Sequence, residues 1–246
     1  MSPDRRKHRG PHPDDRGLFS DEVVPILREA GSHLSWLLTR GYTIRSSLKL
    51  VGDRYQLHER QRIAIRRASC SKQSRDDRTS RLLSPSETRG QALQVDGLNV
   101  IVSVEAAIAG GVLLLCQDDT IRDLASVHGS YRKVDETTLA VRLIGNELET
   151  TAPESTEWLI DRPVSNSGRL AEIIRTEATR RGASWSVELV TNPDRILKSS
   201  ELVAASSDSA VLDRTARWLN LTRNVIDTYI PEAWIIDLRL PPSASN

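Results

Sequence analysis

Three short apolar segments of the chain each run into a carboxylate, and this pattern restricts the folds available to its C-terminal part. The segment at 94–102 is rich in Val and Ile and contains Asp96-Gly97, the segment at 157–161 ends at Asp161, and the segment at 202–208 ends at Asp208. Apolar runs of this length bounded by turn residues predict buried strands. In open α/β sheets, ligands bind outside the carboxyl ends of the strands. The sequence therefore predicts a sheet with acidic residues along one edge.

Further strands and helices alternate along the same part of the chain. We predict strands at 112–116, 186–190 and 233–238, and helices at 104–108, 139–148, 169–181 and 209–219. A turn is expected at 192–194. Strands that alternate with helices predict an α/β domain with a mainly parallel sheet. We assign this domain to residues 91–246.

The N-terminal part predicts a small helical module at 20–69. Apolar residues recur at helical spacing from Val23 to Leu38, and Gly41 ends that helix. Two shorter helices, at 43–51 and 57–68, flank a turn at 52–55 that contains Gly52, an arrangement similar to a helix-turn-helix. Four arginines crowd the last helix and are candidates for contacts with a nucleic-acid backbone: Arg60, Arg62, Arg66 and Arg67. The alternative is a helical bundle whose arginines face water.

Two further segments show no periodicity that predicts structure. Residues 1–19 have almost nothing to bury, so we expect a disordered tail. Residues 70–90 are rich in Ser, Arg, Asp and Thr, and we expect a flexible linker between the helical module and the α/β domain.

The net charge of +1 hides a strong asymmetry. Residues 1–92 hold 19 Lys/Arg and 11 Asp/Glu, a net charge of +8, whereas residues 93–246 hold 15 and 22, a net charge of −7. The first part therefore has the charge of a polyanion binder, and the second has the charge of an acidic domain that holds metal ions. A merely solvated basic surface is the alternative.

The cysteines and the hydropathy indicate a cytoplasmic protein. Cys70 and Cys116 are the only cysteines and lack the spacing of a zinc site or a disulfide framework, which favours a reducing compartment. No apolar run is long enough to cross a membrane, and the first residues lack the apolar core of a signal peptide. We therefore expect no membrane association.

The carboxylates suggest a metal site. If the sheet brings Asp96, Asp161 and Asp208 together, their charges repel one another unless a cation lies between them. We also expect Glu105 and Asp213 as metal ligands, on the helices that follow two of the strands. Oxygen ligands suit Mg²⁺ or Mn²⁺, which can activate water to attack a phosphodiester. The alternatives are structural: a turn at Asp96, a helix cap at Asp208 and a solvent-facing Glu105.

Accessory groups are expected near these acids. Arg122, Asp123 and His128 are candidates for phosphate binding or proton transfer, although a buried Arg–Asp pair that holds a loop explains the first two equally well. The loop at 162–168 precedes a helix and carries Ser165 and Ser167, as at helix N-termini that bind anions.

Several of these motifs together resemble a known prokaryotic family. The motifs are Leu50-Val51-Gly52-Asp53-Arg54-Tyr55, Arg60-Gln61-Arg62, Val95-Asp96-Gly97-Leu98-Asn99-Val100, Arg122-Asp123, Asp161-Arg162-Pro163-Val164-Ser165-Asn166-Ser167-Gly168 and Ser207-Asp208-Ser209-Ala210. The combination is similar to domain of unknown function 434 joined to a second uncharacterised domain. That second domain resembles PIN-like nucleases, in which the first strand ends in Asp, often within Asp-Gly-x-Asn.

The PIN-like resemblance implies an α/β/α fold, an Mg²⁺ or Mn²⁺ site and RNA cleavage. It places Asp96, Asp161 and Asp208 in the catalytic site, with Asn99 beside them. Our leading hypothesis is a metal-dependent ribonuclease whose helical module binds RNA, with DNA as a second candidate substrate. The alternatives are a non-catalytic nucleic-acid binder or regulator that dimerises through its acidic domain, and a phosphate-ester enzyme that uses the loop at 165–168.

Overall fold

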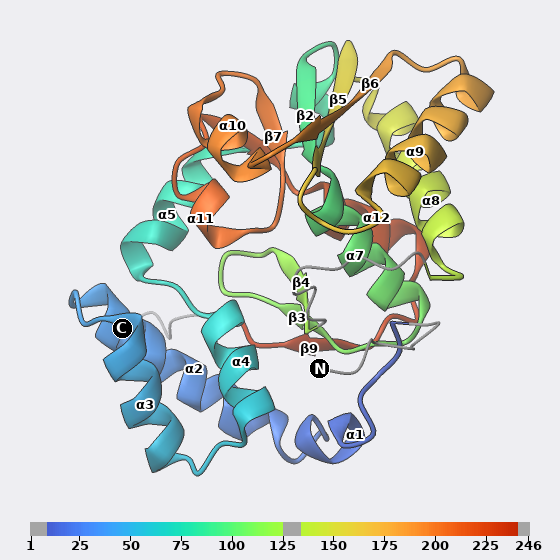
Figure 1. Ribbon diagram of the computed structural model, residues 1–246. Helices are drawn as coiled ribbons and strands as arrows, with labels where there is room; N and C mark the ends of the chain where they lie inside the picture. Colours follow the sequence, from blue (N-terminus) through green and yellow to red (C-terminus); the bar gives the residue numbers. More distant parts are fainter. Residues whose placement is uncertain (1–8, 125–133, 241–246) are drawn as a thin grey trace.

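The computed structural model describes residues 9–124 and 134–240, and within them a six-stranded parallel sheet forms the centre of the larger part of the molecule (Figure 1). Its strands, in spatial order, are β1 (Leu82–Leu83), β8 (Arg217–Leu219), β7 (Val203–Ala205), β2 (Ala92–Asp96), β5 (Ser155–Asp161) and β6 (Trp185–Val190). All five pairings between neighbouring strands are parallel. The predicted mixed α/β class with a mainly parallel sheet is therefore confirmed.

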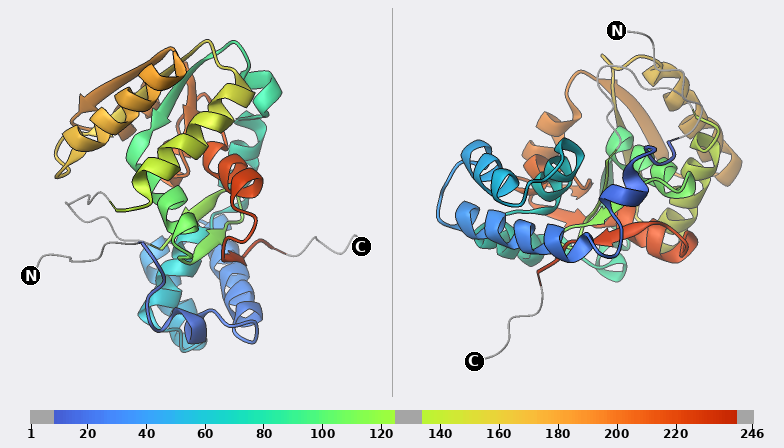
Figure 2. Two further views of the ribbon diagram at one scale, coloured as in Figure 1. Left: turned by 90° about the vertical axis from the view of Figure 1, so that its right-hand side faces the viewer. Right: turned by 90° about the horizontal axis from the view of Figure 1, so that it is seen from below.

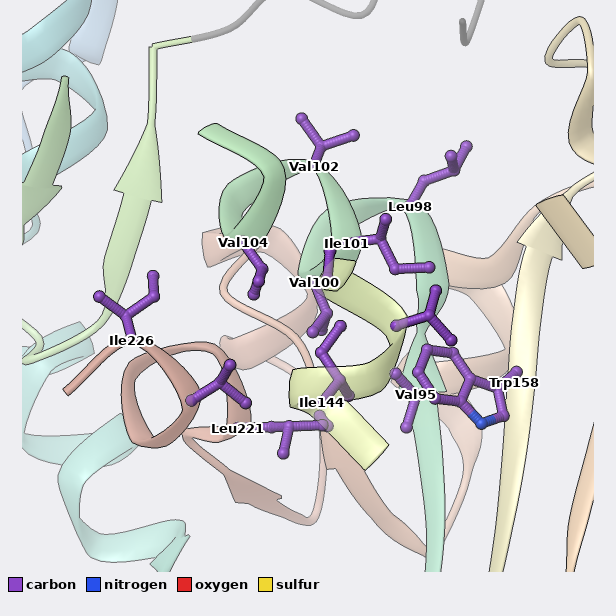
Figure 3. Packing of buried hydrophobic residues seen from close by; sticks show 14 of the residues in the cluster. Val95, Leu98, Val100, Ile101, Val102, Val104, Ile144, Trp158, Leu221 and Ile226 are labelled. Carbon is purple, nitrogen blue, oxygen red and sulfur yellow. The ribbon is translucent and has the colours of Figure 1, made fainter. Parts of the chain in front are cut away.

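Helices cover both faces of this sheet because its strands are apolar on both sides. On β5, Trp158 and Ile160 belong to one core cluster, whereas Leu159 between them belongs to another. The first cluster, part of which is shown in Figure 3, packs under α7 (Gly97–Ile108), α8 (Thr137–Thr151), α9 (Ser167–Arg181) and α12 (Leu221–Tyr229). The second packs under α10 (Pro193–Ser199) and α11 (Ser209–Leu212). The result is a three-layer α/β/α arrangement.

The strand order places a topological switch point beside β2. After β2 the chain forms β5 and then β6 on one side, and it next returns to form β7 and β8 on the other side. The connections that follow β2 and β7 therefore run in opposite directions. They open a crevice at the carboxyl ends of these two strands, which is where open α/β sheets bind ligands.

A separate three-stranded sheet joins the α/β layers to the N-terminal helices (Figure 2). It consists of β4 (Ile121–Asp123), β3 (Leu113–Leu115) and β9 (Ile235–Asp237). The strands predicted at 112–116 and 233–238 therefore exist, but they pair with each other outside the main sheet. Helices α2 (Val24–Thr39) and α4 (Glu59–Ala68) pack on this small sheet, and α3 (Ile44–Arg54) packs on both helices.

The helical module shares its core with the small sheet. Leu27 and Leu34 of α2 and Ile65 of α4 are fully buried in one cluster with Leu114 of β3 and Ile236 of β9. The predicted helices are present, but Gly52 lies within α3, and the turn between α3 and α4 is at 55–58. The shared cluster means that the α/β domain supplies part of the core on which these helices depend.

The expectation of a flexible linker at 70–90 is wrong. This segment contains α5 (Lys72–Arg81), β1 and α6 (Pro85–Thr88), and Ser71 and Ser84 accept hydrogen bonds as helix caps. The Trp218 indole donates to the Arg78 carbonyl at 2.8 Å, which ties α5 to β8. Sequence periodicity missed α5 because the helix is polar and buries a single arginine, Arg78.

The expected disordered tail also needs correction. Residues 1–8 lie outside the described residues, but residues 9–19 are placed and include α1 (Asp15–Leu18). Asp15 is fully buried in an ion pair with Arg60, and Phe19 belongs to the core shared with the small sheet. These two contacts hold a segment that has little apolar surface of its own.

Several boundaries in the α/β domain differ from the sequence prediction. The apolar run at 94–102 is a strand only to Asp96, and helix α7 starts at Gly97. The run continues into this helix because the Val-rich turns of α7 are buried on almost every side. The helix predicted at 209–219 ends at Leu212, and the chain forms β8 from Arg217. The turn expected at 192–194 is the start of α10, with Asn192 as its cap.

Candidate functional site

The switch point brings Asp96 next to the loop that follows β7. The Ser206 hydroxyl donates to Asp96 Oδ2 at 2.8 Å, across 110 residues of chain. One turn into α7, Asn99 Oδ1 accepts from both the amide and the hydroxyl of Ser207, at 2.8 and 2.9 Å. These bonds join the first turn of α7 to the loop after β7. They fix the Asp96 carboxylate at the carboxyl end of β2.

Asp96 is buried in the field of three other carboxylates. Burial is the main cause that raises its pKa to about 7, and Asp194, Asp161 and Asp208 raise it further, while the Ser206 hydrogen bond lowers it. The side chain is 5% exposed. The pKa of Asp161 is also raised, first by burial and then by Asp194. Folding therefore places Asp161 and Asp208 within electrostatic range of Asp96.

Each of these acids comes from a different element. Asp161 ends β5, which pairs directly with β2, and is half-buried. Asp208 is half-buried and caps α11, because its Oδ1 accepts the amide of Ala210 at 2.7 Å and that of Val211 at 3.3 Å. Asp194 lies in the first turn of α10. Asp208 is therefore a helix cap, as the structural alternative predicted. Its negative charge also acts on Asp96.

The acids do not form a closed metal cage. Across residues 9–124 and 134–240, no group of three or more His, Cys, Asp or Glu side chains is close enough to hold a metal ion. Mg²⁺ differs from zinc in this respect, because it keeps several water ligands and is commonly held by one or two carboxylates and the phosphates of a substrate. The carboxylate oxygens at the switch point are the type of ligand that this mode of binding uses, and their negative charge suits a divalent cation.

Glu105 and Asp213 lie apart from this group. Glu105 is fully buried on α7, where it forms an ion pair with Arg9 and accepts a 2.5 Å hydrogen bond from Thr137. Asp213 accepts hydrogen bonds from the Arg78 guanidinium at 2.6 and 2.8 Å. Both carboxylates have cationic partners, so the structure supports neither as a ligand beside Asp96.

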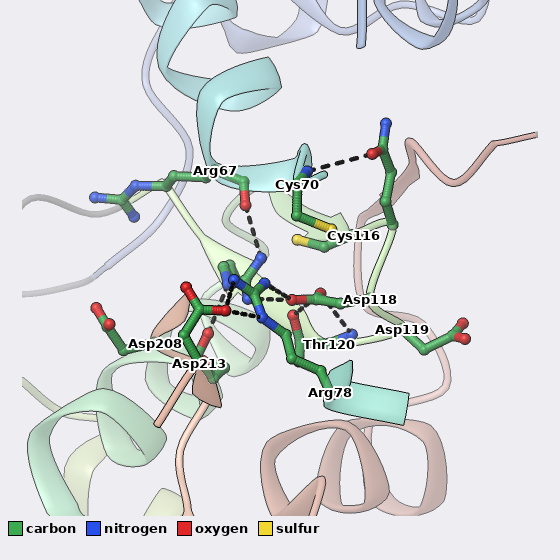
Figure 4. A network of polar contacts seen from close by, with 12 residues as sticks. Arg67, Cys70, Arg78, Cys116, Asp118, Asp119, Thr120, Asp208 and Asp213 are labelled. Carbon is green, nitrogen blue, oxygen red and sulfur yellow. Dashed lines mark hydrogen bonds and ion pairs between the residues drawn. The ribbon is translucent and has the colours of Figure 1, made fainter. Parts of the chain in front are cut away.

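Arg122 belongs to a buried ionic network with Asp118 and Arg78, and the latter two residues are labelled in Figure 4. Its guanidinium donates to the carbonyl of Ser207 at 2.6 Å, to the carbonyl of Arg67 at 2.7 Å and to Asp118 at 2.6 Å. Arg78 donates to the same carboxylate at 2.5 Å. Burial alone raises the pKa of Asp118, but Arg122 and Arg78 hold it down at about 2.

This network favours a structural role for Arg122 over phosphate binding. The side chain is 10% exposed, and its bonds connect the end of α4 to the loop that carries Ser206 and Asp208. Sequence analysis paired Arg122 with Asp123, whereas the structure pairs it with Asp118. Asp123 instead accepts a 2.7 Å hydrogen bond from Ser103 and lies near Arg67.

The remaining candidates are scattered. His128 lies outside the described residues. Ser165 is exposed in the loop before α9, and Ser167 is buried with its hydroxyl donating to the Arg162 carbonyl at 3.4 Å. Among the residues that the structure describes, no contact joins either serine to Asp96.

The four arginines of α4 divide into structural and exposed groups. Arg60 pairs with the buried Asp15, and Arg62 donates to Asp53 and to the Leu57 carbonyl, both at 2.9 Å. Arg67 donates to the Asp123 carbonyl. Arg66 is exposed. Of this set, Arg66 is therefore best placed to meet a ligand from solvent.

Two important residues were not predicted from the sequence. Ser206 immediately precedes Ser207-Asp208, and its position at the end of β7 was the available signal. Asp194 was read as part of a turn, although Asn-Pro-Asp is also a typical helix start, with a cap followed by proline and an acid.

The geometry defines an α/β protein of the doubly wound type with an acidic switch-point site. Comparison with known families then gives a more specific assignment. The chain belongs to the family described as Domain of unknown function (DUF5616), whose profile matches residues 85–224. Residues 26–81 match a second family, described as Protein of unknown function (DUF434). The resemblance to domain 434 joined to a second uncharacterised domain is thus confirmed.

A curated relative shares both parts of the chain. It is uncharacterized protein MJ0935 of Methanocaldococcus jannaschii, 31% identical over 186 residues that cover 76% of this chain and 88% of the relative. No solved structure matches. Among the residues that the structure describes, no helix is long and apolar enough to span a membrane.

Proposed function

We propose that this protein is a metal-dependent ribonuclease that hydrolyses phosphodiester bonds at the switch point. The observation that carries the proposal is the position of Asp96, which is buried at the switch point near Asp161, Asp194 and Asp208, so that its pKa rises to about 7. Such crowding destabilises the ionised form unless a cation is present. A divalent ion beside Asp96 relieves that repulsion and gives the acids a common role.

The donor set suits Mg²⁺ or Mn²⁺. Asp96 and Asp161 supply carboxylate oxygens from adjacent strands, and the nearby charge of Asp208 acts on Asp96. Asp194, which was not expected from the sequence, also raises the pKa of Asp96, although its own carboxylate pairs with Lys198 at 3.2 Å. When bound, such an ion activates water and stabilises charge on the phosphoryl oxygens.

The protein's own groups position the site. Ser206 donates to Asp96 Oδ2 and so limits the rotation of the carboxylate. Asn99 holds Ser207, and Arg122 holds the carbonyl of the same residue, so the loop after β7 is anchored from two sides. The PIN-like resemblance agrees with this arrangement, because it assigns Asp96, Asn99, Asp161 and Asp208 to one site.

The proposed substrate class follows from charge. The N-terminal part carries a net charge of +8, and Arg66 is exposed near the end of α4. Arg122 connects the last turn of α4 to Ser207, so the basic helices lie beside the acidic crevice. A polyanion that binds these helices can therefore reach Asp96, and RNA is the polyanion that the PIN-like resemblance implies.

The test is cleavage of a fluorescently labelled RNA by the purified full chain with Mn²⁺, Mg²⁺ or EDTA. We expect cleavage that requires the metal and falls at least 100-fold in Asp96→Asn, with RNA binding retained. Glu172→Gln is the matched control, because Glu172 is exposed on α9. Equal cleavage by Asp96→Asn and by the parent protein contradicts the proposal. A DNA oligonucleotide of the same sequence tests the second candidate substrate.

A non-catalytic nucleic-acid binder is the second candidate. It is favoured by the lack, among the described residues, of three acids close enough to hold a metal ion. In that case the acidic site is degenerate, and the protein binds RNA without cleaving it in either metal. Light scattering of the purified chain then tests whether the acidic domain forms a homodimer.

A further inference from the structure

A basic groove lies between α3 and α4, on the surface of the helical module. It has a volume of about 190 Å³. Its lining residues are Arg45, Leu48, Lys49, Glu59, Arg62, Ile63 and Arg66. Four cations, a single carboxylate and two aliphatic side chains therefore surround a small hollow.

The four cations form two pairs that face each other across the groove. Arg45 and Lys49 are four residues apart on α3, and Arg62 and Arg66 are four residues apart on α4. Residues at this spacing lie on one face of a helix, about 6 Å apart along its axis. That separation is comparable to the distance between successive phosphates of a nucleic-acid strand. Each helix therefore presents cations at the spacing of a phosphate backbone.

Two of the cations are available to a ligand. Arg45 and Arg66 are exposed, and no hydrogen bond or ion pair of their side chains occurs within the described part of the chain. Lys49 pairs with Asp53 at 2.8 Å, but the two side chains are 79% and 53% exposed, and exposed pairs of this kind are weak. A phosphate can therefore recruit all three cations without breaking a buried contact.

Arg62 is held in place before any ligand binds. It donates to the Leu57 carbonyl and to Asp53, and its guanidinium lies directly over Gly52. A Cβ atom at position 52 would lie 2.1 Å from Arg62 Nη1, so a side chain there would displace the guanidinium. Gly52 therefore positions Arg62 at the groove, which is a different role from the turn predicted for it.

We propose that this groove binds the phosphate backbone of an RNA strand that continues to the acidic site. The inference rests on the proposed function and adds Arg45 and Lys49, which the sequence did not single out. The direction of the RNA strand follows from the position of α4. Arg66 lines the groove, and the carbonyl of the next residue, Arg67, accepts a hydrogen bond from Arg122. Arg122 in turn holds Ser207 beside Asn99. The aliphatic side chains of Leu48 and Ile63 suit contact with ribose.

The test is fluorescence anisotropy of a labelled RNA oligonucleotide with the full chain in EDTA, so that hydrolysis does not affect the result. We expect Arg45→Gln/Arg66→Gln to bind at least tenfold more weakly. The slope of log affinity against log salt concentration should fall by about 1.4, as two lost phosphate contacts to a single strand predict.

The matched control is Arg54→Gln/Arg142→Gln, which removes the same charge elsewhere. Arg54 is exposed on α3 but lies half a helical turn from the Arg45 face, and Arg142 is exposed on α8. We expect less than a threefold change in affinity. An equal loss in both double variants, or no loss in either, overturns the inference.

The outcomes separate the groove from the catalytic proposal. Normal RNA binding by the groove variant, together with metal-dependent cleavage by the parent, refutes the groove and leaves the ribonuclease proposal in place. Weakened binding by the groove variant without cleavage by the parent supports the groove and refutes catalysis. If the parent binds anionic vesicles and not RNA, the groove inference is also refuted.

Discussion

Asn99 and Ser207 are 108 residues apart in the chain, yet a single side-chain oxygen of Asn99 accepts both the amide and the hydroxyl of Ser207. This pair joins the first turn of α7 to the loop after β7, next to Asp96. Because Ser206 precedes Ser207 and donates to Asp96, the same contact also sets the orientation of the candidate catalytic carboxylate.

We therefore expect Asn99→Ala to destabilise the fold and to weaken activity. The buried amide of Ser207 loses its acceptor, which costs about 1–3 kcal/mol. Asn99→Asp retains an acceptor but adds a negative charge near Asp96, so its stability should depend more strongly on divalent cations. Urea unfolding with and without Mn²⁺ measures both effects. An alanine variant as stable as the parent contradicts this role of Asn99.

The raised pKa of Asp96 predicts a pH-dependent stability. Its folded-state pKa is about 7 against an ordinary value of 3.8, so the folded protein binds more protons than the unfolded chain between these pH values. Stability therefore falls as the pH rises from about 4 to 7. Asp96→Asn removes this effect and should be more stable than the parent at pH 8, by a few kcal/mol at most, with little difference at pH 4.

Urea unfolding at the two pH values checks this expectation without any activity assay. Asp161→Asn should change stability in the same direction but by less, because Asp161 is only half-buried. An Asp96→Asn effect that is the same at pH 4 and pH 8 shows that the carboxylate is not perturbed in the folded protein.

A side chain at position 97 should destabilise the fold. A Cβ atom there would lie 2.2 Å from Ile160 Cδ1 and 3.2 Å from the carbonyl oxygen of Leu159. Such overpacking costs about 1–3 kcal/mol, which we expect for Gly97→Ala in thermal or urea unfolding. Ile160→Val in the same chain should restore part of the loss. Gly168→Ala is the control, because its added Cβ meets nothing within 4 Å.

Arg78→Met should destabilise the protein strongly. It removes one of the two cations that hold the buried Asp118, and breaking a buried ion pair in this way costs about 3–5 kcal/mol. Adding Asp118→Asn should cost further stability, since the buried Arg122 guanidinium then loses its carboxylate partner as well. Lys72→Met on the same helix breaks only an exposed pair with Asp76 and should have no measurable effect. Equal stability of both single variants contradicts the proposed role of α5.

Much of the α/β domain could be predicted from local pattern. The apolar runs that stop at Asp96, Asp161 and Asp208 identified β2, β5 and β7, because a buried strand must be apolar on both faces and its polar neighbours are left at its end. The same reasoning failed at 97–102, where Val and Ile form a helix that is buried on nearly all sides. Periodicity carries no information when every face is covered.

The polar segments were beyond the reach of such patterns. Helix α5 looked like a linker because Arg78 is buried through ionic partners, Asp118 and Asp213, that lie far away in the chain. Residues 9–19 looked disordered for a similar reason, since Asp15 is buried through its pairing with Arg60. Burial of a charge depends on a partner that local composition does not reveal.

The sequence by itself determined the chemical types at the site: carboxylates after strands, an amide at Asn99 and a basic N-terminal part. The tertiary structure decided which of them meet. It brought Asp194 and Ser206 to Asp96, and it directed Glu105 and Asp213 to arginines elsewhere. The physical reason is that strand order and helix packing determine the distances between charges, and neither can be read from the spacing of residues along the chain.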